Sequence, residues 1–306
     1  GFFMASDIYD SKPWLKFYAP GVPASINYER ITLHEMFYRT AAKYPDRDAL
    51  IFQGYRIKYS ELRDLVDTLA AFLSSKGIKK GDVVAILLAN MIQTVASYYA
   101  VLKIGGIVQM NNPLYTDREL EYQFNDSGAK FLITLDLLAS RMIALREKTK
   151  IEHIIWTSIA DYLPGLKKFL VKLVGKKKGL CADVPAASKV YHWAEAASFK
   201  GNVPEVTVDF EDTAVYQYTG GTTGQSKGAI LTHKNLCCMI QMYEAWFPTL
   251  KKGDEVLIAA APVFHVLGMS AAMNLPMYMG WTAVMVPKPQ PKELLEATRK
   301  YRPTVC

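Results

Sequence analysis

A run of glycines and threonines that ends in lysine is the part of the sequence best suited to chemistry. Glycines adopt positive φ without a steric penalty, so successive backbone N–H groups can turn toward one anion. Threonine hydroxyls can face a metal ion or a phosphate oxygen, and a lysine supplies positive charge. We therefore predict a phosphate-binding loop over 218–228. The run reads Tyr218-Thr219-Gly220-Gly221-Thr222-Thr223-Gly224-Gln225-Ser226-Lys227-Gly228, and its candidate phosphate ligands are Thr219, Gly220, Gly221, Thr222, Thr223, Gly224 and Lys227.

The segments on either side predict that this loop joins two strands. Residues 213–218 and 228–232 contain the β-branched and aromatic side chains that are common in strands. A Walker A loop instead opens a helix and carries Ser or Thr after its lysine, whereas Gly228 follows Lys227 here. The sequence therefore argues against an ordinary P-loop nucleoside triphosphatase. A flexible hairpin that binds no ligand is the alternative interpretation.

Five further runs, together with residues 218–235, resemble the adenylate-forming superfamily, and most closely its AMP-forming long-chain fatty-acid CoA ligases. The resemblance covers roughly residues 30 to 306. Two positions depart from the superfamily's commoner loop, Gly220 where Ser or Thr is frequent and Ser226 where Pro is frequent. The five runs are Lys58-Tyr59-Ser60-Glu61-Leu62, Leu102-Lys103-Ile104-Gly105-Gly106, Asn111-Asn112-Pro113-Leu114-Tyr115-Thr116, Asn125-Asp126-Ser127-Gly128-Ala129-Lys130 and Pro262-Val263-Phe264-His265-Val266-Leu267-Gly268.

The resemblance implies a ligase that uses ATP, Mg²⁺ and coenzyme A. A fatty-acid carboxylate would attack the α-phosphate, pyrophosphate would leave, and the acyl adenylate would pass to the thiol of coenzyme A. Lys227 would hold the β- and γ-phosphates with the loop N–H groups, and Thr219 would lie near Mg²⁺. His265 would line the acyl pocket as the second catalytic candidate. A strand-end histidine bonded to backbone is the alternative for His265.

Several parts that the resemblance leads us to expect are absent from the 306 residues. They are the Tyr-Gly-x-Thr-Glu block, a ribose-binding aspartate, a hinge and a small carboxy-terminal domain with the lysine used in adenylation. We therefore expect an amino-terminal fragment that is inactive by itself. The three residues Gly1-Phe2-Phe3 before Met4 are expected to be a remnant of cloning.

Two other classes of function stay open. One is a different adenylate former, such as an acyl-AMP ligase, an aryl-acid ligase or a peptide-synthetase adenylation domain. The other is a nonenzymatic nucleotide-binding or lipid-surface protein. Thiol-dependent AMP release separates the first class from a CoA ligase, and ATP–pyrophosphate exchange separates the second.

Helical and strand patterns alternate along the chain, which predicts an α/β fold. Short apolar runs between helices are typical of strands buried on both faces, so we expect a layered sandwich of mostly parallel sheets flanked by helices. The resemblance implies two sheets that exchange strands, and we place an approximate boundary near 175–210, between subdomains 4–180 and 205–306. Expected helices are 31–43, 60–76, 90–103, 117–126, 136–148, 234–246 and 291–300, with Asn90 as a cap; expected strands are 49–53, 83–88, 106–110, 130–134, 153–157, 213–218, 228–232, 255–260 and 282–286.

Two long uncharged stretches, 83–102 and 258–287, raise the question of a membrane span. Polar residues, prolines and glycines interrupt both, so each is better interpreted as alternating strands and helices. The four cysteines form neither a metal-site spacing nor a disulfide framework. No secretory signal is visible at the start. A cytoplasmic protein is the simplest expectation.

The positive charge is concentrated in one segment. Between Lys167 and Lys178 there are six lysines and no acid, in a chain whose net charge is +7. Apolar residues in 163–178 follow helical spacing. One interpretation is an interfacial helix that contacts anionic membrane on the inner face, and the other is a solvated basic helix whose apolar stripe packs on the domain. Nucleic-acid binding is not expected, and a homodimer stays open.

Overall fold

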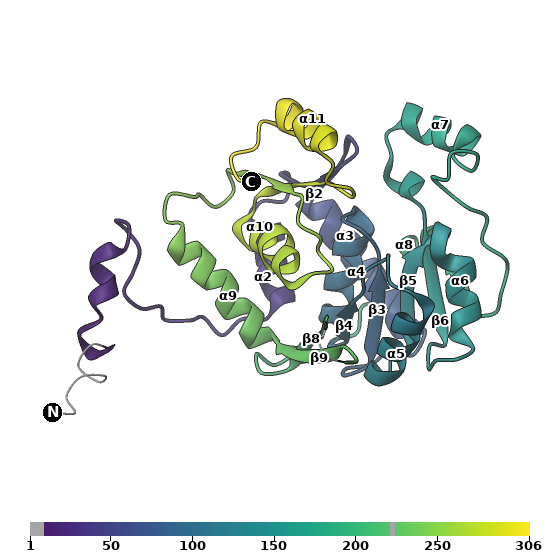
Figure 1. Cartoon of the computed structure of the whole chain (residues 1–306), viewed down its shortest axis with the longest axis horizontal. Helices are drawn as coiled ribbons and strands as arrows, with labels where there is room; N and C mark the ends of the chain where they lie inside the picture. Colours follow the sequence, from purple (N-terminus) through teal and green to yellow (C-terminus); the bar gives the residue numbers. More distant parts are fainter. Residues whose placement is uncertain (1–8, 221–223) are drawn as a thin grey trace.

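The structure is a computed structural model that describes residues 9–220 and 224–306. Its strands form two sheets with helices on their faces (Figure 1). The larger sheet has the order β7-β6-β5-β3-β4-β8-β9, and the smaller has the order β10-β11-β1-β2. Neighbouring strands are parallel except at β8–β9 and β1–β2, which are antiparallel pairs at sheet edges. The predicted α/β sandwich of mostly parallel sheets is therefore confirmed.

All nine expected strands are present, with ends that differ by at most one residue from the prediction. The structure adds β2 and β7, which are short edge strands. The strands are β1 (Asp48–Phe52), β2 (Tyr55–Lys58), β3 (Val83–Leu87), β4 (Ile107–Met110), β5 (Phe131–Leu135), β6 (His153–Thr157), β7 (Val190–His192), β8 (Thr213–Thr219), β9 (Lys227–Thr232), β10 (Val256–Ala259) and β11 (Thr282–Met285).

The seven expected helices are also present. Thr116 accepts a hydrogen bond from the backbone of Glu119 and begins α5 with the predicted capping box. The α-helices are α2 (Leu33–Lys43), α3 (Tyr59–Ser75), α4 (Ile92–Lys103), α5 (Asp117–Ser127), α6 (Asp136–Arg146), α7 (Gly165–Val174), α8 (Trp193–Ala197), α9 (His233–Trp246), α10 (Leu275–Met279) and α11 (Pro291–Tyr301); η1 (Pro13–Phe17) and η2 (Ile159–Tyr162) are 3₁₀ turns, and η3 (Gly268–Asn274) is a π-helix.

The main core lies between the two sheets, and α4 runs through it. Eleven of its twelve residues are buried, and Lys103 at its end is the exception. The ring of Tyr99 stacks on Phe37 of α2 with centroids 4.7 Å apart. Its hydroxyl donates to Asn274, whose amide in turn donates to Tyr98. This buried network fixes the end of η3 against α4.

The expectation that Asn90 caps α4 is wrong. The helix begins at Ile92 after Met91, and the Asn90 side chain points to another part of the chain. Its amide donates to the carbonyls of Ala259 and Ala261, and its carbonyl accepts from the backbone of Val263. The two carbonyls and the Val263 N–H lie at and after the end of β10, where the hydrogen bonds between strands stop. Without Asn90 these backbone groups would be unpaired. Asn90 therefore joins the two sheets.

Each sheet takes strands from both expected subdomain regions, 4–180 and 205–306. The smaller sheet pairs β1 with β11, and the larger sheet pairs β4 with β8. The expected boundary near 175–210 therefore does not divide one sheet from the other. Residues 83–102 contain β3 and most of α4, and 258–287 contain parts of β10 and all of η3, α10 and β11. In the described ranges, no helix is long and apolar enough to cross a bilayer.

Candidate functional site

The predicted phosphate-binding loop joins β8 to β9 at the edge of the larger sheet. The two strands are antiparallel, with Tyr218 opposite Gly228 and Thr219 opposite Lys227. The expected strand–loop–strand arrangement is therefore confirmed. Three of the candidate phosphate ligands, Gly221, Thr222 and Thr223, lie outside the described residues.

Lys227 is the first residue of β9, and its side chain is exposed. Within ranges 9–220 and 224–306, its ammonium has no hydrogen-bond or ion-pair partner. Lys234, which follows β9, differs because it pairs with Glu211. An unpaired ammonium beside open loop backbone is free to meet an anionic ligand.

The described glycines of the loop do not use the left-handed region. Gly220 and Gly224 both lie outside positive φ, contrary to our expectation. A Cβ added at either would meet no atom within 4 Å. Their contribution in this structure is therefore an open edge at which a ligand could approach the backbone closely. The Thr219 hydroxyl lies 3.4 Å from the Lys227 carbonyl, which accepts from it and closes the strand pair.

Helix α5 anchors both ends of the loop. The Tyr218 hydroxyl donates to Asp126 at 2.6 Å, and the Gln123 amide donates to the Ser226 hydroxyl at 3.2 Å. Gln123 also accepts from Asn111 at 2.7 Å, which extends the chain of hydrogen bonds into the core. Burial and the nearby Asp126 carboxylate raise the pKa of Tyr218 well above its usual range. Ser226 therefore has a specific partner at the position where proline is commoner in the superfamily.

Gly228 packs against this anchor. A Cβ at this position would lie 3.1 Å from the ring of Tyr218, which covers it from the opposite strand. A side chain there would require the ring, whose hydroxyl bonds Asp126, to shift by a few tenths of an ångström. The glycine after the lysine thus has a packing reason that is separate from phosphate binding.

His265 lies in the turn that follows β10. Its side chain is exposed, and its Nδ1 accepts from the backbone of Leu267 at 3.3 Å. This bond to backbone is the arrangement named as the alternative for His265. The Gln217 amide of β8 donates to the carbonyl of Phe264 at 3.1 Å, which brings the His265 turn beside the strand that enters the loop. No described contact joins the side chains of His265 and Lys227.

The described residues provide no cluster of three or more His, Cys, Asp or Glu side chains for a metal ion. The donor that the sequence analysis assigned to Mg²⁺ is the Thr219 hydroxyl, which is exposed. Mg²⁺ in phosphate-transfer sites keeps several waters and takes many ligands from the substrate's own phosphates. One hydroxyl fits an ion that arrives with ATP and does not fit a resident metal site.

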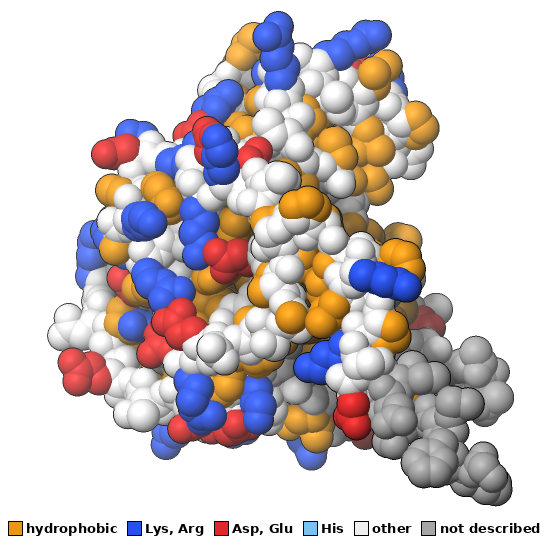
Figure 2. Space-filling model, turned by 90° about the vertical axis from the view of Figure 1, so that its left-hand side faces the viewer, with side chains coloured by type: hydrophobic (Ala, Val, Ile, Leu, Met, Phe, Trp, Pro, Cys, Tyr) orange, Lys and Arg blue, Asp and Glu red, His pale blue; other side chains and the backbone are white. Residues whose placement is uncertain are grey.

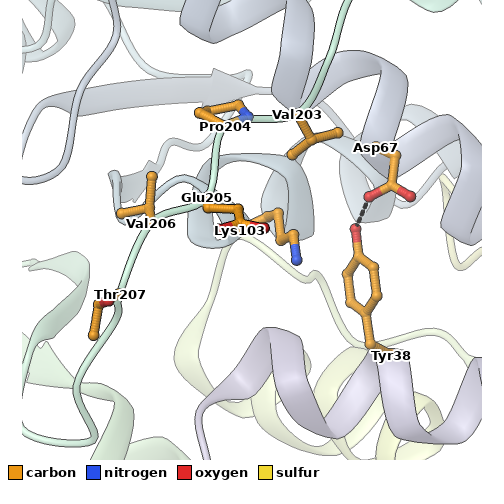
Figure 3. Close-up of a pocket in the computed structure, with 8 residues that line it drawn as sticks. All are labelled: Tyr38, Asp67, Lys103, Val203, Pro204, Glu205, Val206 and Thr207. Atoms are coloured by element: carbon orange, nitrogen blue, oxygen red, sulfur yellow. Dashed lines mark hydrogen bonds between the residues drawn. The ribbon is translucent and has the colours of Figure 1, made fainter.

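A cavity of about 560 Å³ lies away from the loop (Figure 3). In it the Tyr38 hydroxyl points to Asp67 and donates to it, and the ammonium of Lys103 lies 4.5 Å from the Tyr38 ring centre. The segment 203–207 forms the opposite wall. No residue of 218–228 lines this cavity, so it does not extend the candidate site.

Sequence reasoning missed the residues that hold the loop in place. Gln123, Asp126 and Gln217 were not among the candidates, although two of them lie in or beside quoted runs. Gln123 could have been found from its position, because a polar residue between Leu120 and Phe124 falls on the apolar face of its helix. For Asp126 and Gln217 the partners are about 90 and 50 residues distant, as the sequence separations of their bonds show, and no local pattern indicates them.

Comparisons with known proteins agree with this architecture. A long-chain-fatty-acid CoA ligase of Bacillus subtilis is 38% identical over 298 residues, which cover 96% of this chain and 53% of that protein. One from Salmonella typhimurium is 35% identical over 292 residues, covering 91% and 51%. The chain therefore spans about half the length of the curated relatives it matches.

Solved structures share the fold. A long-chain-fatty-acid-CoA ligase from Archaeoglobus fulgidus superposes with a TM-score of 0.71 at 25% identity, over 94% of this chain and 53% of that one. An anthranilate CoA ligase with bound anthranoyl-AMP gives a TM-score of 0.74 at 19% identity, over 90% and 49%. Residues 37–306 match the family described as AMP-binding enzyme. The chain is thus a member of the family described as AMP-binding enzyme.

Proposed function

We propose that this chain forms the phosphate-binding part of a long-chain fatty-acid CoA ligase. The enzyme joins a fatty acid to AMP, with release of pyrophosphate, and then transfers the acyl group to coenzyme A. The observation that carries the proposal is the unpaired Lys227 ammonium at a loop whose two ends are anchored on α5. Sequence identities of 38% and 35% to named long-chain ligases support the choice of substrate.

The chemistry requires alignment and charge stabilisation more than a strong base. The carboxylate is already a nucleophile: its oxygen forms a bond to the α-phosphorus, and the bond from that phosphorus to the bridging oxygen breaks. Negative charge then grows on the departing pyrophosphate. In our proposal Lys227 and the loop N–H groups of residues 219–224 hold the β- and γ-phosphates, and Thr219 contributes a ligand to the Mg²⁺ of MgATP.

His265 has a positioning task in this proposal. Its backbone-bonded Nδ1 leaves Nε2 to carry the proton and to face outward. Gln217 ties its turn to β8, so the imidazole and the loop would keep a constant separation. We propose that Nε2–H steers the fatty-acid carboxylate toward the nucleotide. His265 need not act as an acid or a base, since no proton is transferred when a carboxylate attacks phosphorus.

Binding of MgATP and of pyrophosphate to the 306-residue chain, measured by calorimetry, tests the loop. Lys227→Ala should weaken binding by roughly ten- to a hundredfold, the usual range for a charge-assisted hydrogen bond. Lys234→Ala is the matched control, because Lys234 is close by and already pairs with Glu211. Equal affinities for the parent chain and Lys227→Ala would count against the phosphate-binding loop.

Activity is tested in the full-length product of the gene that encodes this chain. ATP–pyrophosphate exchange that depends on a long-chain fatty acid, and AMP release that depends on coenzyme A, are the expected results. Exchange without thiol-dependent AMP release would indicate an acyl-AMP ligase, and exchange with aryl acids only would indicate an aryl-acid ligase. The 306-residue chain alone should form no acyl-CoA. Acyl-CoA formation by it at the rate of the full-length enzyme would contradict this last expectation.

A further inference from the structure

Helix α7 presents its apolar face to solvent. In the described structure none of its ten residues is buried, and five large apolar side chains are exposed. At 100° per residue these five cover an arc of about 140° on one side of the helix. They are Leu166 (74% exposed), Phe169 (59%), Leu170 (49%), Leu173 (62%) and Val174 (38%). Packing of this stripe on the domain, the second interpretation of segment 163–178, is wrong.

The opposite side of α7 holds it to the molecule. Lys168 and Val171 are half-buried and Gly175 is buried. The Lys167 ammonium donates to the carbonyl of Gln53 in the turn between β1 and β2, at 2.9 Å. The apolar arc therefore points directly away from the body. Figure 1 shows α7 at the upper right, connected to the rest of the chain by two extended segments.

Lysines surround this apolar arc. Lys167 and Lys172 lie on its two sides at helical spacing, and 176–178 adds three more after the helix. The first acid after the segment, Asp183, pairs with Lys176. Elsewhere the charge is balanced: on the face in Figure 2, basic and acidic side chains are interspersed. The segment thus combines outward apolar groups with a local charge of a single sign.

We propose that α7 is a membrane-surface anchor that inserts its apolar face among the headgroups of an anionic bilayer. Lys172, Lys177 and Lys178 would then contact lipid phosphates while the apolar side chains enter the acyl boundary. A protein partner fits less well, because a specific interface buries about 800 Å² on each side. A helix about 15 Å long with five partly exposed side chains supplies less than that. The anchor is a property of this chain's surface and does not depend on the ligase activity.

Cosedimentation of the 306-residue chain with vesicles tests the anchor. The chain should bind vesicles of phosphatidylcholine and phosphatidylglycerol at 3:1 in low salt, and much less to phosphatidylcholine alone. Added salt should weaken binding, since the Debye length falls to about 8 Å at physiological ionic strength. No binding to anionic vesicles at low salt would overturn the proposal.

Two sets of variants separate the apolar and the electrostatic parts. Replacing Lys172, Lys177 and Lys178 by Gln should reduce partitioning roughly a hundredfold. The control replaces three exposed lysines elsewhere, Lys150, Lys200 and Lys292, by Gln, removes the same charge, and should have a much smaller effect.

Phe169→Ser should lower partitioning by about tenfold or more, as expected for loss of a buried aromatic side chain. Leu114→Ser is its control, because Leu114 is 88% exposed on a distant loop. All variants should keep the parent's circular dichroism and melting temperature, since the substituted side chains are exposed. If Phe169→Ser binds vesicles as well as the parent chain, the segment acts only as an electrostatic patch. If the parent chain dimerises without lipid and Phe169→Ser does not, a second copy of the chain covers the apolar face. Either result overturns the anchor.

Discussion

Helices α4 and α7 have similar lengths and are both rich in apolar residues, yet their surroundings are opposite. In α4 eleven of twelve residues are buried, including Gln93, Thr94 and Ser97, whereas in α7 none of ten is buried. Helix α4 lies between the two sheets, and α7 touches the body along one narrow side. The difference shows that hydrophobicity alone does not determine whether a helix is buried. Burial also depends on which elements pack against each face of the helix.

The polar residues of α4 show what burial requires. Gln93 donates to the Thr157 hydroxyl and to the Ser158 carbonyl, so it connects α4 to the end of β6. In α7 the polar residues are lysines, whose ammonium groups could not be buried without a partner. A buried helix therefore carries neutral amides and hydroxyls, although the Ser97 hydroxyl and the Gln93 carbonyl have no hydrogen-bond partner among the described residues. An exposed one carries charge.

The largest expected effect of a single substitution is at the centre of α4. Tyr99→Ala removes a ring that stacks on Phe37 and a hydroxyl that bonds Asn274. Loss of a buried aromatic side chain costs about 3 to 5 kcal/mol. Urea denaturation should show this loss in the free energy of unfolding. Phe169→Ala in α7 is the matched change, and a loss above about 1 kcal/mol there would mean that α7 is packed after all.

Asn90→Ala should have the next largest effect. It removes three hydrogen bonds, to Ala259, Ala261 and Val263, and leaves their backbone groups unpaired in the core. We expect a loss of about 3 kcal/mol, since each buried unpaired group costs roughly 1 to 3 kcal/mol. Asn125→Ala removes a single exposed bond to Lys148 and should cost less than about 1 kcal/mol. Equal losses in the two variants would refute the role of Asn90 in joining the sheets.

The packed side of the molecule should also respond to acid. Burial lowers the pKa of His34 and of His233 from 6.5 to about 4. At His34, the neighbouring charge of His233 also lowers the pKa. The unfolded chain therefore takes up these protons at higher pH than the folded one. Stability should be full above about pH 6.5 and fall as the pH drops toward 4.

Each buried histidine should lower the free energy of unfolding at pH 5 by about 2 kcal/mol relative to pH 7.5, since one pKa unit corresponds to about 1.4 kcal/mol. His233→Asn keeps an acceptor for the backbone of Leu33, which His233 now binds at 3.1 Å, and should lose part of the pH dependence. Urea titrations of both proteins at the two pH values measure this. Identical pH dependence in the two proteins would contradict the burial explanation. Helix α7 contains neither histidine nor carboxylate, so acid should not act on it directly.

The smallest effect is expected at the phosphate loop's anchor. Ser226→Ala removes only the part-buried bond from Gln123, so stability should fall by about 1 kcal/mol or less. Binding of MgATP should weaken by a few-fold through the position of Lys227. Gln123→Leu is the companion variant: it should give the same few-fold change, with a larger loss of stability because it also removes the buried bond from Asn111. Unchanged MgATP affinity in both variants would mean that α5 does not position the loop.

The sequence was sufficient to predict the parts of the fold that are governed by local pattern. Apolar runs such as Val83–Leu87 and the capping box at Thr116 predict their elements because the signal lies within a few residues. The loop between strands β8 and β9 followed from residue types in the same way, and its binding of phosphate stays a prediction. Edge strands β2 and β7 give a weaker signal, since they have only four and three residues, of which Ile57 alone is buried.

Long-range partners are what sequence reasoning missed. Asn90 follows a strand and precedes a helix, which favours a cap, but acceptors 169 and 171 residues away compete for its amide. The face that α7 turns to its body depends in part on the carbonyl of Gln53, 114 residues distant. The spacing of its apolar residues predicts the helix but cannot say which side is covered.

The pairing of β1 with β11 has a consequence for synthesis. Roughly 230 residues of chain separate the two strands, so β1 and β2 leave the ribosome long before the strand that completes their sheet. At about 5 to 20 residues per second, the parallel edge of β1 waits for about 10 to 50 s. During that interval four of its five residues, buried in the finished protein, have no neighbour on one side. Nascent chains that end before residue 282 should therefore be substrates for chaperones that bind apolar strands, and protease protection of Leu50 and Ile51 on stalled ribosomes should appear only after β11 emerges.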